Sequence, residues 1–151
     1  MMLRATPRFA RRILLLIAVL AVGGTLVSAV SLHHHYGTSA TAYCDIGPNF
    51  NCDIVNRSTY STIFGVPVAL IGIAGYLTVL TVATFYRNQP EAVAMLAIGS
   101  LAGLGFALYL TYVEGFVLAT WCILCLSSLA LIFSIAVLSS LLWVHRVHSA
   151  D

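Results

Sequence analysis

Four long runs of apolar residues, separated by polar stretches, organise the chain. The runs cover residues 13–32, 64–86, 92–113 and 116–144. Each holds about 20 residues or more, and at ~1.5 Å per residue a helix of that length crosses the roughly 30 Å of hydrocarbon in a bilayer. Antiparallel helices with short connections pack as a bundle. The pattern therefore predicts an all-α integral membrane protein, a four-helix bundle with one long loop, residues 33–62, between the first two helices.

The ends of the runs carry helix-start signals. Pro67 is expected in the first turn of the second helix, where its missing N–H is not needed. Pro90 and Glu91 suit the first turn of the third, Pro by its fixed φ and Glu by the helix dipole. The first run is longer than the apolar core of a typical signal peptide, so we expect it to be an uncleaved span.

Composition agrees with a membrane location. Only 8% of the residues are charged and 60% are hydrophobic, whereas a soluble domain carries about 25% charged residues. The net charge of +2 does not indicate nucleic-acid binding, because all seven cationic residues are arginines and six of them flank the apolar runs.

Arginine placement predicts the orientation of the helices. If the spans alternate, six arginines fall on one side of the membrane and Arg57 on the other. By the positive-inside rule residues 1–12 and the tail 145–151 are then cytoplasmic, and the loop 33–62 is exoplasmic. The six are Arg4, Arg8, Arg11, Arg12, Arg87 and Arg146.

The four cysteines form two pairs. Cys44 and Cys52 lie in the long loop, and Cys122 and Cys125 lie near the start of the last apolar run. Two pairs in a membrane chain favour an oxidising compartment, and the predicted orientation brings both to the exoplasmic face. With the last span starting at residue 116, Cys122 is expected ~9 Å and Cys125 ~13 Å into the membrane. Near a helix N-terminus the dipole favours the thiolate, the form that attacks disulfides.

Several interpretations of these cysteines remain open. Cys122 and Cys125 could be small buried hydrophobes, and Cys44 with Cys52 could be a structural disulfide. A zinc site formed by all four is disfavoured, because seven residues separate the loop cysteines, more than the usual two to four. The functional hypothesis is a relay in which thiol–disulfide exchange carries two electrons from the loop to the membrane pair.

Two other features have both an ordinary and a functional interpretation. The His33–His35 run could bind metal, but directly after a span it is more typical of the solvated interface, and we predict no metal site. Glu114 ends the third run, where a charge is usually interfacial; its functional interpretation is a proton carrier.

The cysteine pattern and one further segment together resemble the vitamin K epoxide reductase family. The pattern comprises Cys44-Asp45, Cys52, and Cys122-x-x-Cys125 in the last span, and the segment is Ser58-Thr59-Tyr60-Ser61-Thr62-Ile63-Phe64-Gly65-Val66-Pro67. The resemblance covers roughly residues 10–145, and the domain of that type would be 13–144. The Ile-Phe-Gly-Val-Pro stretch resembles the bacterial branch of the family.

The resemblance implies roles for individual residues. Cys44 would exchange with a DsbA-like thioredoxin-fold partner and pass electrons to Cys52, which would attack Cys122, and Cys125 would face a membrane quinone. No thioredoxin-like domain follows Val144, so we expect the partner to be a separate chain. The quinone would be of the ubiquinone, menaquinone or vitamin K type. Quinone contacts are predicted at Ser58, Ser61, Thr62 and Phe64.

The sequence thus predicts a quinone-dependent thiol-disulfide oxidoreductase of the bacterial inner membrane that supports disulfide formation. One rival is an epoxide reductase of the endoplasmic reticulum. Leu129 argues against it, because the vertebrate enzymes resemble one another in carrying tyrosine there. A second rival is a non-catalytic four-span protein whose cysteines form structural disulfides.

Overall fold

A computed structural model describes residues 7–38 and 44–148 of the chain. The predicted segments 1–12, 33–62 and 145–151 each extend partly outside these residues, and Arg4 lies wholly outside them. Apart from one hairpin of two-residue strands and two isolated bridges, the described part of the chain consists of helices and irregular connections, which confirms the helical fold class. The long helices are α1 (Pro7–Tyr36), α3 (Val68–Thr84), α4 (Pro90–Tyr112) and α5 (Ile123–His148).

Three of these helices are long and apolar enough to cross a membrane, namely α1, α4 with the turn that extends it, and α5. Helix α3 is equally apolar but has 17 residues, about 25 Å at 1.5 Å per residue. The short hairpin of β1 (Thr62–Ile63) and β2 (Val66–Pro67) directly precedes it.

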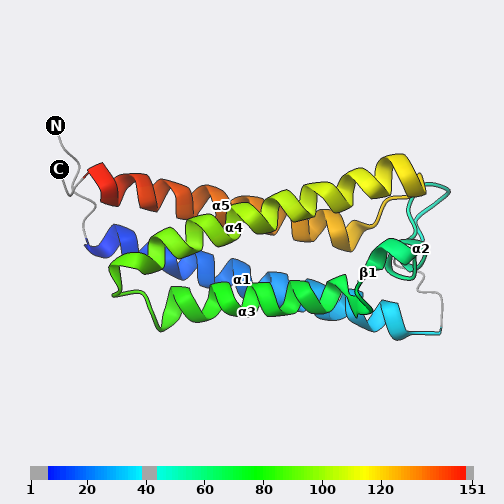
Figure 1. Cartoon of the computed structure of the whole chain (residues 1–151), viewed down its shortest axis with the longest axis horizontal. Coiled ribbons are helices and arrows are strands. Elements are labelled where there is room, and N and C mark those ends of the chain that lie inside the picture. Colours follow the sequence, from blue (N-terminus) through cyan, green and yellow to red (C-terminus); the bar gives the residue numbers. More distant parts are fainter. Residues whose placement is uncertain (1–6, 39–43, 149–151) are drawn as a thin grey trace.

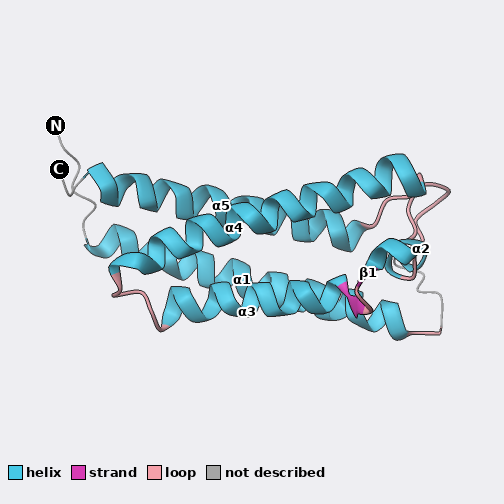
Figure 2. Cartoon of the chain, viewed as in Figure 1, coloured by secondary structure: helices cyan, strands magenta, loops and turns pink. Residues whose placement is uncertain are grey.

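The long helices lie side by side (Figure 1). Helix α1 packs against α3 and α5, and α4 packs against α5. The start of α1, the end of α5 and the α3–α4 connection share one end of the molecule. The other end carries the short helix α2 (Cys52–Asn56), the hairpin and the connection between α4 and α5 (Figures 1 and 2).

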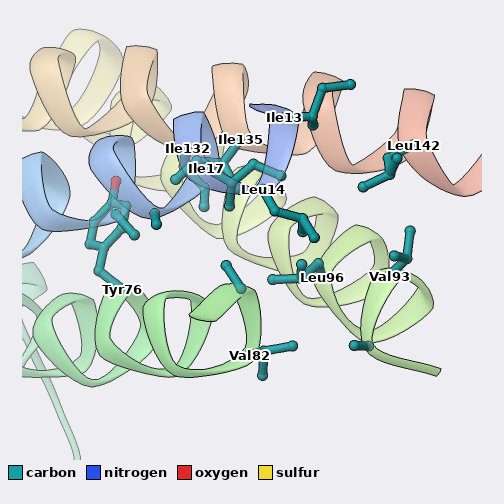
Figure 3. Close-up of a cluster of buried hydrophobic side chains, with 14 residues drawn as sticks. Ile13, Leu14, Ile17, Tyr76, Val82, Val93, Leu96, Ile132, Ile135 and Leu142 are labelled. Carbon is teal, nitrogen blue, oxygen red and sulfur yellow. The ribbon is translucent and has the colours of Figure 1, made fainter. Parts of the chain in front are cut away.

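A buried apolar cluster fills the space between the long helices, with Ile17 of α1 and Ile135 of α5 fully enclosed (Figure 3). Close approach of α1 and α3 depends on Gly24, because a Cβ there would lie 2.2 Å from Cε1 of Tyr76. In lipid, such contacts hold helices together by van der Waals packing, since the surrounding tails are as apolar as the core.

The second long helix starts later than the predicted boundary of residue 64. Phe64 and Gly65 have positive φ values of 51° and 80° and form the turn of the hairpin. Helix α3 then begins at Val68, and Pro67 is its N-cap residue and not part of its first turn. Apolarity alone cannot separate a strand from the first turn of a helix, which explains the difference.

The last long helix also starts later than the predicted residue 116. Helix α4 continues into a π-helix, Val113–Leu118, and Ala119 then takes a left-handed conformation with φ 50°. Helix α5 starts at Ile123. Cys122 therefore lies just before the helix, and Cys125 lies in its first turn. The prediction, which started the helix at residue 116, had placed both cysteines about two turns further into it.

Candidate functional site

The loop pair forms a disulfide. Cys44 and Cys52 are bonded, with their Cα atoms 5.6 Å apart, and both side chains are buried. Cys52 is the first residue of α2. The helix starts here because the Asn51 side chain accepts a hydrogen bond from the Ile54 N–H at 3.1 Å, which caps the free amides of the first turn.

Helix α2 is fastened to the end of α1 by polar contacts. Nδ1 of His34 lies 3.0 Å from Oδ1 of Asp53, and the His34 side chain is almost fully enclosed. The Arg57 guanidinium donates to the carbonyls of His34 and Gly37, and the His35 ring bonds to the carbonyl of Asn56. The histidine run, interpreted as an interfacial feature, thus holds the cysteine-bearing loop in place.

Backbone hydrogen bonds join the same loop to the residue before the membrane pair. The Trp121 N–H donates to the Asn49 carbonyl at 2.8 Å, and the Asn51 N–H donates to the Trp121 carbonyl at 3.1 Å. Cys52 directly follows Asn51, and Cys122 directly follows Trp121. The two cysteine pairs are therefore held side by side by main-chain contacts.

Cys122 and Cys125 are free thiols at the start of α5. Cys122 has no exposed surface and belongs to one buried cluster with Cys44 and Cys52, against which Cys125 packs. The Asn56 side-chain amide bridges the two pairs, because its Nδ2 donates to the Cys52 carbonyl at 3.0 Å and lies 3.8 Å from Sγ of Cys122.

The buried carboxyl of Glu114 lies beside the membrane pair. This side chain, in the π-helix, is only 2% exposed. Its Oε2 accepts a hydrogen bond from the Cys122 N–H at 3.1 Å, and Glu114 and Cys125 line the same cavity. Its Oε1 is buried without a hydrogen-bond partner among the described residues. The carboxyl is therefore not an exposed interfacial charge.

A cavity of about 250 Å³ adjoins the membrane pair. Its wall is mostly apolar and comes from the long helices and from the segment around Ser58. Of the four cysteines, Cys125 alone is among its lining residues. The polar side chains in the wall are Ser28, Ser31, His35, Asn56, Ser58, Tyr60, Ser61, Tyr76, Glu114 and Ser128.

The structure places the four predicted quinone contacts differently. Ser58 and Ser61 line the cavity, whereas Thr62 and Phe64 are not among its lining residues. Phe64 stands at the tip of the hairpin with its ring fully exposed (103%), because the positive φ that makes the turn points it away from the protein.

Sequence reasoning missed several residues of the site. Tyr76 is buried and donates a hydrogen bond from its hydroxyl to the Ser128 carbonyl at 2.9 Å, with Ser128 Oγ also at 2.9 Å. A tyrosine at mid-span and a serine three residues after Cys125 were the available signals. Asn56 gave none, and the histidine run did not indicate that His35 lines the cavity, since both places depend on how the loop folds back.

Among the described residues, no group of three or more His, Cys, Asp or Glu side chains could hold a metal ion. Two cysteine pairs in contact can exchange disulfides, and a thiol in the wall of an apolar cavity can meet a nonpolar electron acceptor.

The family comparison agrees with this geometry. A family model described as Vitamin K epoxide reductase family matches residues 15–140, which is most of the chain and includes all four cysteines. The family consists of oxidoreductases that couple thiol–disulfide chemistry to quinone redox chemistry in membranes. The match, the apolar helices and the disulfide beside a free thiol pair together show that this chain belongs to the vitamin K epoxide reductase family.

Proposed function

We propose that this oxidoreductase takes electrons from a reduced thioredoxin-fold protein of the DsbA type and delivers them to a membrane quinone. The route runs through Cys44, Cys52, Cys122 and Cys125 in that order. The observation that carries the proposal is that three buried sulfurs lie in one cluster while Cys125 alone lines the adjoining cavity.

The first stage is exchange between the partner and the loop. A partner thiolate attacks Cys44 and releases the Cys52 thiolate, and the partner's second thiol then resolves the mixed disulfide. The partner leaves oxidised, and Cys44 and Cys52 become a dithiol. The loop has to open for this step, since Cys44 is buried.

The second stage passes the electrons to the membrane pair. With Cys122 and Cys125 oxidised, the Cys52 thiolate attacks Cys122 and displaces Cys125, and Cys44 then resolves the Cys52–Cys122 disulfide. This restores the loop disulfide and leaves Cys122 and Cys125 as thiols, which is the pairing seen in the structure. Asn56 holds the attacking Cys52 next to its target Cys122, since its side chain contacts both residues.

The cavity fits the headgroup of a quinone. Its largely apolar wall suits an aromatic ring, and its few polar groups, Ser58 and Ser61 among them, suit ring carbonyls. A bound quinone supplies a ring that accepts two electrons and two protons. The chain's own part is to present the Cys125 thiol at the wall, to enclose Cys122 and to keep water from both.

We further propose that the protein lies in a bacterial inner membrane with the cysteines on the exoplasmic side. Support comes from the arginines. Helix α1 begins, and helix α5 ends, with arginine-bearing turns at the same end of the molecule, and the connection with Arg87 lies there too (Figure 1). The cysteines lie at the opposite end, which the positive-inside rule assigns to the exoplasm.

The test is the Cys125→Ala variant in proteoliposomes that contain quinone. We expect complete loss of quinone reduction, while Cys52–Cys122 accumulates as a trapped disulfide that peptide mapping detects. The Cys44→Ala variant is the matched control, since it should lose oxidation of the partner but keep all the groups that face the cavity. Quinone turnover retained by Cys125→Ala would overturn the proposed route.

A further inference from the structure

The carboxyl of Glu114 is unusual among the acidic groups of the described residues. It is nearly fully enclosed, and no salt bridge in the described part of the chain reaches it. An ionised carboxylate buried without a partner is strongly unfavourable. The position therefore calls for an explanation beyond the ordinary charge at the end of a span.

The local backbone is built to place this carboxyl. A π-helix inserts an extra residue into the end of α4, a distortion that is frequent at functional sites. The Glu114 carbonyl accepts the Thr120 N–H at 3.1 Å, which closes the turn. The Trp121 ring packs so closely on Gly115 that a Cβ there would lie 2.9 Å from Cη2. The indole thus covers the turn and helps to exclude water.

The two carboxyl oxygens of Glu114 have different surroundings. Oε2 accepts the Cys122 N–H and so fixes the carboxyl at the start of α5. Oε1 is buried and has no donor among the described residues, so it is free to carry a proton itself. Glu114 and Cys125 line the same cavity, and the carboxyl is already bonded to Cys122, three residues before Cys125. A proton on this group is therefore within reach of the one sulfur that must leave and return.

We propose that Glu114 is the catalytic proton shuttle of the membrane pair: it protonates Cys125 when Cys52 displaces that sulfur from Cys122, and it takes the proton back when the pair is reoxidised. This inference rests on the proposed function, because it assumes that Cys52 attacks Cys122. It adds a residue that the thiol relay does not itself require.

The steps balance. In the exchange, the Cys52–Cys122 bond forms, the Cys122–Cys125 bond breaks, and the proton moves from Glu114 to the Cys125 sulfur. In reoxidation, two S–H bonds break and one S–S bond forms, and two electrons and two protons pass to the quinone, which becomes a hydroquinone. The Cys125 proton returns to Glu114, which ends the reoxidation protonated for the next cycle. The hydroquinone takes its two protons from Cys122 and, through the surrounding water, from the proton that Cys52 released when it ionised. The shuttle spares the chain a bare thiolate at Cys125 in an apolar wall.

Other titratable groups must be separated from Glu114 in any test. His35, Tyr60 and Tyr76 line the same cavity, and Cys122 and Cys125 are the reacting thiols. Asp53 of α2 and Arg57, the C-cap residue of that helix, are engaged with each other and with the end of α1. Of these groups only Glu114 combines a hydrogen bond to the membrane pair, from the Cys122 N–H, with an unpartnered buried oxygen.

The experiment measures the exchange step without quinone. Quinone-free protein with both pairs oxidised is mixed with excess reduced thioredoxin, quenched in acid, alkylated and mapped by mass spectrometry. Each sample reports two rates, the opening of Cys44–Cys52 and the appearance of free Cys125. In Glu114→Gln, which keeps an acceptor for the Cys122 N–H, we expect the first rate to be unchanged and the second to fall on the order of 100-fold.

The pH profile distinguishes a shuttle from a structural role. In the wild type the second rate should rise as the Cys52 thiol ionises and fall again as Glu114 loses its proton, whereas Glu114→Gln should show only the rise. Glu114→Asp should restore the falling limb. Glu91→Gln, the same change at the exposed start of the same helix, should match the wild type.

The outcomes are separable. Equal rates and profiles in Glu114→Gln and the wild type would overturn the shuttle while leaving the relay intact. Failure of the wild type to release Cys125 at all would instead overturn the proposed function. A slowed rate that keeps its falling limb in Glu114→Gln would assign that limb to another group and also overturn the shuttle.

Discussion

Replacing Gly24 by alanine should separate α1 from α3, while the same change at the preceding residue should not. At Gly24 a new Cβ would lie 2.2 Å from the Tyr76 ring, whereas at Gly23 it would lie 3.8 Å from the nearest atom, a Cδ of Leu131. The ring would have to retreat by about 1.2 Å to reach an ordinary 3.4 Å contact. It cannot do so freely, because its hydroxyl is bonded to Ser128.

The size of the effect follows from these contacts. Overpacking in a tight core costs about 1–3 kcal/mol, and losing the Tyr76 hydrogen bond adds about 0.5–1.5 kcal/mol. Alanine is the better helix former by about 1 kcal/mol, and this gain applies equally at both positions. The free energy of unfolding of Gly24→Ala should therefore lie about 2–4 kcal/mol below that of Gly23→Ala.

The assay is unfolding of the purified protein in mixed micelles with increasing dodecyl sulfate, followed by circular dichroism. Because Tyr76 also lines the cavity, Gly24→Ala should weaken quinone binding as well, and Gly23→Ala should not. Equal unfolding free energies for the two variants would refute the account of how α1 and α3 approach each other.

Two further predictions concern the loop and the cavity. Asp53→Asn removes the charge that pairs with His34 and should slow exchange from Cys52 to Cys122 several-fold, by about 0.5–1.5 kcal/mol. The control is Asp45→Asn, at an exposed position, which should leave this rate unchanged. Equal exchange rates for the two variants in the quench assay would contradict the anchoring role of Asp53. Ser61→Ala should raise the quinone KM about 5-fold through loss of a ~1 kcal/mol contact. Phe64→Ala should leave the quinone KM unchanged. A KM raised by Phe64→Ala and unchanged in Ser61→Ala would instead make Phe64 a contact of the quinone ring.

Apolar patterning predicts the helices of this chain well, because a run such as 13–32 has no alternative that satisfies its backbone in lipid. The patterning fails where an apolar segment forms a turn or a strand and does not continue a helix. The turn at Phe64 and Gly65 and the left-handed Ala119 both interrupt apolar sequence. Both breaks lie beside the site, and they decide where Cys122 and the hairpin fall.

The candidate site shows the same division. The cysteines are visible in sequence because their spacing is distinctive, and they come together in the structure. The burial of Glu114 cannot be predicted from the sequence, because a glutamate at the end of a span can lie either in water or under a neighbouring side chain. Likewise, nothing local indicates that Asn56 reaches Cys122 across 66 positions of the chain.

The complete enclosure of Cys122 has a consequence for selectivity among cellular thiols. A small soluble thiol such as glutathione can reach the pair only through Cys125, on the side of the apolar cavity, or by opening the loop. In the proposed relay Cys122 joins the two half-reactions, and its enclosure insulates this sulfur from the bulk thiol pool. On the proposed route, electrons from a protein donor are thereby kept from soluble oxidants, and each turnover is committed to the lipid phase.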